Sequence, residues 1–162
     1  MQEQSVSCLT VEHIGVDIIH GRQLFLTTLA DSWDWADPMI DRFVLFTGAD
    51  ARSASDAQIA SYAQASIASG CAYVCCWGPD CERVHDTFDL AAADQFVCST
   101  WHSDESMADG MYFAAFLTHL DPDEVDGADV AVLFAVQPAW HAEARALLGN
   151  QVELVRQFVG DD

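Results

Sequence analysis

The sequence predicts an α/β fold, and three observations support this prediction. Four short segments are apolar at nearly every position, which is the pattern of strands buried on both faces. Segments with helical spacing of apolar residues alternate with these strands along the chain. No repeat, proline-rich linker or low-complexity tract divides the 162 residues. We therefore expect a single domain at 1–162, of the Rossmann-like (flavodoxin-like) three-layer kind, with a mainly parallel sheet.

The N-terminal quarter of the chain is expected to lie at the periphery of this domain. We place residues 1–40 outside an α/β core that spans 41–162. β-branched stretches within 8–28 predict one or two peripheral strands. The acidic and aromatic segment 31–38 contains a proline and predicts a crossing over the surface before the main sheet.

The first two core strands are expected at 43–47 and 71–77, where apolar residues are continuous. A helix is expected over 55–69, because its apolar residues recur on one stripe, and Gly70 is placed to end it as a C-cap. A short helix, 81–89, is expected after the Gly-Pro-Asp turn that follows the second strand.

The third and fourth core strands are expected at 96–100 and 130–136. Between them, Ser103 is expected to cap a helix that carries acidic residues in its first turn. Its apolar face is formed by Met107, Met111, Ala114 and Leu117, and is widened by Phe113 and Phe116. A last helical segment is expected over 139–158, interrupted at Gly149-Asn150.

The chain is strongly acidic. Asp and Glu total 26 against six Lys and Arg, which gives a net charge of −20 at pH 7, and all six cations are arginines. This balance argues against a protein that tracks nucleic-acid phosphates. Solubility, tolerance of high salt and recognition of a basic partner each explain such a surface, and composition alone does not separate them.

Targeting signals and regular cysteine spacing are not evident. The N-terminus lacks a cationic region followed by an apolar one, and the longest apolar run, 111–117, is too short to span a membrane. We expect a cytoplasmic protein without membrane contact. Free, mostly buried thiols are then expected rather than disulfides for the six cysteines, which are Cys8, Cys71, Cys75, Cys76, Cys81 and Cys98.

The loops that follow the four core strands are the expected place for a ligand, because α/β sheets bind ligands at the carboxyl ends of their strands. Cys81 lies in one such loop, near a helix N-terminus that lowers a thiol pKa, and His102 lies in another. In such a pair Cys81 would be the nucleophile and His102 the base. Asp80 or Asp104 could orient the imidazole and complete the set. The alternative is that Cys81 packs beneath the turn and His102 bonds to the backbone, since Asp80 opposes thiolate formation.

A zinc site is a further possibility, with ligands from Cys76, Cys81, His85 and His102. Their spacing is not that of a standard zinc knuckle. Strand alternation is expected to turn Cys71, Tyr73 and Cys75 to one face and Ala72, Val74 and Cys76 to the other. Buried free cysteines are common in α/β strands, so we expect thiols in the core and no metal.

An acidic group formed by Asp80, Asp86, Asp89 and Glu105 offers oxygen ligands of the kind that Mg²⁺ or Ca²⁺ takes. With 26 acids in the chain, such clustering is expected by chance, and a solvated helix face explains it. The chain contains no G-x-G-x-x-G, Walker or G-x-S-x-G motif. We therefore expect no cofactor.

Tryptophans gather at the predicted strand ends. Trp77, Trp101 and Trp140 each stand at or beside one. Three of them along one edge would form a ligand pocket or a protein-binding surface, because an indole buries much apolar area and still presents its N–H. The alternative is that they cover the core beneath the loops.

Two motifs carry a resemblance to a known family: W-G-x-D-C at 77–81 and T-W-H-x-D-E at 100–105. With their flanking residues they resemble a small bacterial α/β domain family of uncharacterised function, over residues 40–148. The resemblance implies an α/β domain with a specialised loop edge, and implies no particular reaction. At 84–86 the chain has Val-His-Asp, where relatives are more acidic.

Two functions are consistent with these features. The first is a non-catalytic binding or accessory module, such as a regulatory or defence-associated protein, that recognises a protein partner or a second copy of itself. It would use an acidic edge that carries Trp77, Asp80, Trp101, Asp104, Glu105 and Trp140. The second is a small hydrolase or nucleotide-processing enzyme that uses Cys81 and His102. An enzyme needs a concave pocket that brings this pair together.

Overall fold

A mostly parallel sheet forms the centre of the molecule. The computed structural model describes residues 11–118 and 130–159, and for residues 158 and 159 it describes the backbone only. Within these ranges one sheet has the strand order β1-β2-β6-β3-β4-β5, in which β1 is antiparallel to β2 and every other pair is parallel. The strands are β1 (Glu12–Val16), β2 (Gln23–Thr28), β3 (Phe43–Gly48), β4 (Cys71–Trp77), β5 (Cys98–His102) and β6 (Ala131–Val136).

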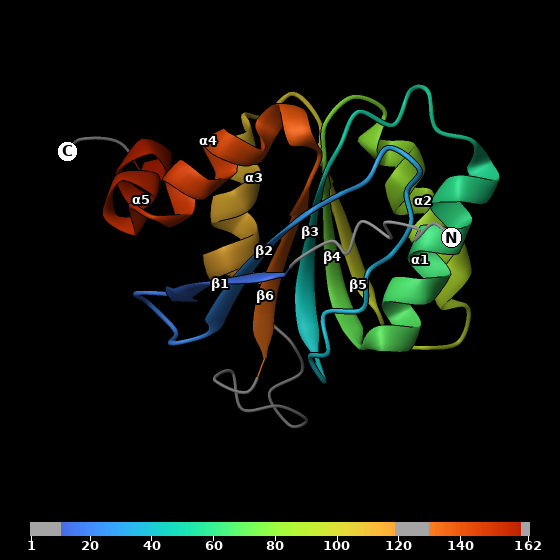
Figure 1. Ribbon diagram of the computed structural model, residues 1–162, viewed down its shortest axis with the longest axis horizontal. Helices are drawn as coiled ribbons and strands as arrows, with labels where there is room; N and C mark the ends of the chain where they lie inside the picture. Colours follow the sequence, from blue (N-terminus) through green and yellow to red (C-terminus); the bar gives the residue numbers. More distant parts are fainter. Residues whose placement is uncertain (1–10, 119–129, 160–162) are drawn as a thin grey trace, which may run out of the picture.

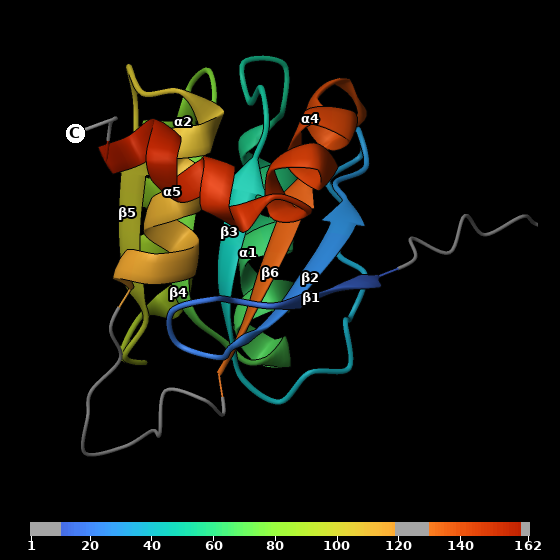
Figure 2. The same ribbon diagram turned by 90° about the vertical axis from the view of Figure 1, so that its left-hand side faces the viewer.

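Helices cover both faces of this sheet (Figures 1 and 2). One face carries α1 (Asp56–Ser69) and α2 (Cys81–Ala92). The opposite face carries α3 (Met107–Tyr112), the one-turn π-helix η1 (Phe113–Leu117), α4 (Pro138–Leu148) and α5 (Gln151–Val159). Among the described residues, no helix is long and apolar enough to cross a lipid bilayer.

Two apolar cores lie on either side of the central strands. Every residue of β3 and β6 is buried, because these strands lie inside the sheet and have helices on both faces. Leu45 and Leu133 pack toward α1 and α2, whereas Phe46 and Phe134 pack toward α3 and α4. This explains why the strands are apolar at every position rather than at alternate positions.

The predicted α/β class and mostly parallel sheet are confirmed, and the strands expected at 43–47, 71–77 and 130–136 match within one residue. The third core strand lies two residues later than predicted, at 98–102, because Phe96 stays outside the sheet and is 70 % exposed. β2 was expected at the periphery. Instead it pairs with β6 along its length and contributes buried leucines to the core.

The helix predicted to begin after Ser103 begins three residues later. Ser106 is its N-cap, and its hydroxyl accepts a hydrogen bond from the backbone N–H of Asp109 at 3.1 Å. Asp104 adopts a left-handed conformation with φ 63°, which a helix cannot contain. The π turn at 113–117 then changes the helical phase, so that Leu117 is half-exposed instead of joining the predicted apolar face.

The crossing segment between β2 and β3 is more than a surface connection. Trp33 is buried against Tyr62 of α1, with ring centroids 5.4 Å apart, and Trp35 stacks on Phe43 at 5.9 Å. Both indoles pack on the core where the chain passes over the sheet between β2 and β3. The segment crosses the surface as predicted, since its acidic residues are exposed, but it also packs these two indoles inward.

The cysteines of β4 depart from strict alternation. A register irregularity between Phe43 and Val44 lets Cys71 join Cys76 in the core beneath α1 and α2, while Cys75 faces the other core. The prediction that Cys71 and Cys75 share a face is therefore wrong. All five cysteines that the structure describes are free thiols, and Cys8 lies outside the described residues.

Gly70 fixes the passage from α1 into β4. Its φ is +122°, and its N–H caps the helix by donating to the carbonyl of Ile67. A Cβ at this position would overlap the carbonyl oxygen of Asp41. Only glycine meets both conditions without moving the backbone.

We expect Gly70→Ala to lower the free energy of unfolding by about 3 kcal/mol or more, because strain at positive φ and a backbone clash act together. Gly21→Ala is the matched control, since Gly21 has φ +77° but its Cβ would meet open space. It should cost only about 1 kcal/mol. Urea unfolding followed by circular dichroism measures both values, and equal losses would contradict the clash.

Candidate functional site

A pocket lies where the chain leaves β4 and β5 toward opposite faces of the sheet. After β4 the chain enters α2 on one face, whereas after β5 it enters α3 on the other (Figure 2). Such a divergence leaves a crevice at the carboxyl ends of the strands. The crevice here has a volume of about 440 Å³ and is lined by residues 77–82 and 102–105.

The chain also diverges between β3 and β6, where Gln137 joins the two loops. The side-chain oxygen of Gln137 accepts a hydrogen bond from the backbone N–H of Asp50 at 2.8 Å. The N–H of Gln137 in turn donates to the carbonyl of Gly48 at 3.0 Å. These two bonds join the loop after β3 to the loop after β6.

The first wall of the pocket is held by the neighbouring loop after β3. The N–H groups of Ala49 and Ala51 donate to the carbonyls of Trp77 and Pro79, each at 3.0 Å. Gly78 permits this close approach, because its φ is +116° and a Cβ there would overlap the carbonyl oxygen of Ala49. These contacts fix the backbone conformation of the turn between β4 and α2.

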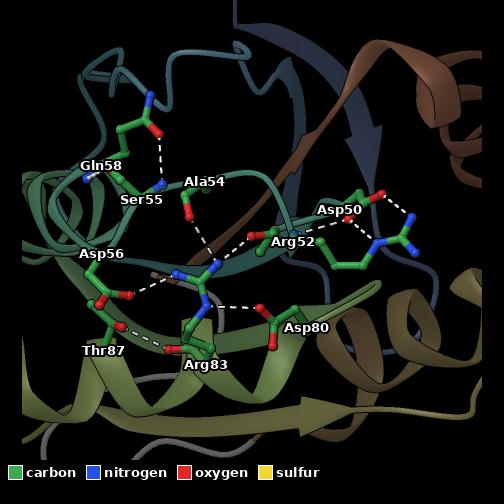
Figure 3. Close-up of polar contacts among 10 residues, drawn as sticks. Asp50, Arg52, Ala54, Ser55, Asp56, Gln58, Asp80, Arg83 and Thr87 are labelled. Carbon is green, nitrogen blue, oxygen red and sulfur yellow. Dashed lines mark hydrogen bonds and ion pairs between the residues drawn. The ribbon is translucent and has the colours of Figure 1, made fainter.

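Arg83 fastens the same two loops together (Figure 3). Its guanidinium donates to the carboxylates of Asp80 and Asp56, both at 2.8 Å. It also donates to the carbonyl oxygens of Ala54, at 3.0 Å, and Ala51. The start of α2 is thereby bound to the segment that precedes α1, and the Asp80 carboxylate is turned toward an arginine.

The second wall is attached to the first through Trp77. The indole N–H donates to the carbonyl of Glu105 at 2.8 Å, and the indole packs edge-on against Trp140 at 5.0 Å. The imidazole of His102 lies 3.2 Å from a Glu105 carboxylate oxygen and 2.9 Å from the hydroxyl of Thr100. Both ring nitrogens of His102 are thus occupied.

Four carboxylates line the pocket, those of Asp80, Glu82, Asp104 and Glu105. Arg83 neutralises Asp80, and Glu105 contacts His102. In the part of the chain that the structure describes, Glu82 and Asp104 form no ion pair. The described residues therefore leave part of the pocket's negative charge unbalanced.

The predicted thiol and imidazole have separate partners. Cys81 is buried beneath the turn, where burial raises the pKa of its thiol, and the backbone of His102 lies against the sulfur. The His102 ring packs on Phe113 at 4.8 Å, on the opposite face of the sheet from α2. Glu105 contacts the imidazole in place of the predicted Asp80 or Asp104. A catalytic role for the pair stays a prediction.

Trp101 lies outside the pocket. It belongs to β5, where neighbouring side chains point to opposite faces, so it turns away from His102. Its ring lies 4.5 Å from that of His85 on α2, and the residue is 44 % exposed. Trp140 supports Trp77 from behind without lining the cavity. Of the three predicted tryptophans, only Trp77 lines the pocket.

The acidic residues predicted to gather divide into two groups. Asp80 and Glu105 line the pocket, whereas Asp86 and Asp89 flank His85 on α2, beside β5. Among the described residues, His85, Asp86 and Asp89 are the only three potential metal ligands within 4.8 Å of one another. The zinc set of Cys76, Cys81 and His85 is not brought together.

Sequence reasoning missed Glu82 and Arg83. Glu82 lines the pocket from the first turn of α2, and Arg83 holds the loop that forms the wall. The i, i+3 spacing of Asp80 and Arg83 was the available signal. No sequence signal predicts the contacts of Arg83 with residues 51–56, because these contacts join segments about 30 positions apart.

A family model matches most of the chain, over residues 22–151. It describes a domain of unknown function, DUF7684. The chain belongs to the DUF7684 family. The matched range of this DUF7684 member includes both walls of the pocket and the Arg83 contacts. Comparisons with curated proteins and with solved structures found no match.

We expect Arg83→Met to lower the free energy of unfolding by about 1–2 kcal/mol, because it leaves loop carbonyls and two carboxylates without their donor. Arg52→Met is the control, since Arg52 pairs with Asp50 of its own loop and is largely exposed. It should leave the urea midpoint unchanged. Equal shifts of the urea midpoint for the two variants would show that Arg83 contributes no more to stability than an exposed ion pair.

Alkylation with iodoacetamide tests the state of the Cys81 thiol. Its raised pKa leaves little thiolate at neutral pH, so we expect Cys81 to react at least about tenfold more slowly in the folded chain than in urea. Peptide mapping by mass spectrometry gives the rate, and Cys98, which is partly exposed, serves as the internal reference. Faster reaction in the folded chain would indicate an activated nucleophile.

Proposed function

We propose that this DUF7684 protein is a non-catalytic binding module that recognises a basic protein partner through the pocket at the ends of β4 and β5. We further assign its fold to the Rossmann-like (flavodoxin-like) three-layer class, in which ligands bind at the carboxyl ends of the strands. The observation that carries the proposal is the unbalanced negative charge of the pocket beside Trp77.

Charge and shape both favour a cationic group from the partner. Glu82 and Asp104 have no ion-pair partner among the described residues, so a cation gains their attraction without breaking an existing pair. The side chain of Trp77 offers an aromatic surface, to which a guanidinium binds well. The net charge of −20 would also attract a basic protein over long distances.

The same charge disfavours self-association as the main interaction. Two copies would each bring −20, and their acidic edges would repel. The enzyme alternative has support from the contact between His102 and Glu105, which orients an imidazole at the pocket. It lacks a ready nucleophile, however, because burial raises the Cys81 pKa.

The test uses a cationic probe, an acetylated and amidated peptide of four Arg-Gly repeats, titrated into the ¹⁵N-labelled chain. We expect the largest amide shifts at 77–82 and 102–105. Raising NaCl from about 0.05 M to about 0.5 M should weaken binding at least fivefold, since the Debye length shrinks. The double variant Glu82→Gln, Asp104→Asn, which removes the two unpaired carboxylates, should weaken it about tenfold.

The matched control changes net charge equally at exposed positions away from the pocket, with Asp31→Asn and Asp94→Asn. It should change affinity by less than about twofold. Equal weakening by both double variants would mean that the probe senses overall charge, and the proposed pocket function would then be wrong.

A further inference from the structure

The two edges of the sheet differ in how they are protected. β1 forms one edge, and it carries a bulge between His13 and Gly15 and a charged residue, Glu12, that pairs with Arg145. Bulges and charges are devices that stop an edge strand from accepting another strand. The β1 edge therefore carries two features that disfavour further pairing.

β5 forms the other edge and has none of these devices. Its five residues, Cys-Ser-Thr-Trp-His, include no Asp, Glu, Lys, Arg or Pro, and its register with β4 has no irregularity. Within residues 11–118 and 130–159, β5 pairs with β4 alone, and Figure 2 shows it at the outer edge of the sheet. Alternate peptide groups of an edge strand point outward and are ready to pair.

Apolar and acidic groups flank this edge. Trp101 is 44 % exposed and Phe96 is 70 % exposed, so a strand beside β5 would bury apolar surface of each side chain. Asp89 on α2 receives a hydrogen bond from the hydroxyl of Ser99, which brings a carboxylate to the same edge. The last residue of β5, His102, lines the acidic pocket. A strand that followed β5 to its end would reach that pocket.

We infer that the β5 edge accepts an extended basic segment of the partner as an additional strand of the sheet. Main-chain hydrogen bonds to β5 would supply affinity, and a cationic side chain at the carboxyl end of the edge would enter the pocket. The segment is basic because Asp89 and the pocket carboxylates lie along its path. A second copy is not the occupant, since its charge is also −20. This inference rests on the proposed function and adds the geometry of binding.

The experiment measures amide hydrogen exchange in the full-length ¹⁵N-labelled chain with a saturating peptide of four Arg-Val repeats. Valine favours the extended conformation, which the Arg-Gly probe does not. Alternate amides within 98–101 should exchange at least tenfold more slowly when the peptide is bound. A peptide of the same sequence that is N-methylated at every residue keeps its charge but cannot donate, and its affinity should fall at least tenfold.

Each other outcome overturns the inference in a distinguishable way. Shifts at 77–82 and 103–105 without protection of 98–101 would leave the proposed function standing and remove strand addition. No shift in either region would contradict both. Equal affinity of the N-methylated peptide would show that main-chain pairing does not contribute. Protection of 98–101 that depends on protein concentration, without peptide, would assign the edge to a second copy.

Discussion

The return of the chain from the edge of the sheet to its centre is the constraint on which the site depends. β3, β4 and β5 follow one another outward with α1 and α2 on one face, and the chain must then come back past β4 and β3 to form β6. Parallel connections are right-handed, so the reversed direction places α3 on the opposite face. The loops after β4 and β5 therefore part from each other, and a pocket lies between them.

Arginine is scarce in this chain, and its placement decides where negative charge remains. Arg83 binds two carbonyls in the loop before α1 and the carboxylates of Asp56 and Asp80. Arg22 is buried with its guanidinium bound to Thr118. Arg145 and Arg156 pair with Glu12 and Glu153. These arginines are thus engaged in contacts within the chain, whereas Glu82 and Asp104 at the pocket form no ion pair among the described residues.

Sequence patterns located the core elements and the two walls of the pocket, because continuous apolar strands and the rule of carboxyl-end ligand sites are strong local signals. They failed where tertiary contacts override local preference. β5 begins after Phe96 although Phe96 and Val97 look strand-like, and Ser106 caps the helix in place of Ser103. Because β5 extends to His102, Trp101 and His102 are neighbours within a strand and point to opposite faces of the sheet. No local pattern predicts the contacts of Arg83 with the loop before α1.

The most direct test of the central claim, that the parting of β4 and β5 creates a receptor for a cationic group, is a crystal structure of the chain grown with arginine methyl ester. We predict a guanidinium between the side chain of Trp77 and the carboxylates of Glu82 and Asp104, with the loops at 77–82 and 102–105 unmoved. Density for the ligand only elsewhere on the protein, with the pocket occupied by solvent, would contradict the account.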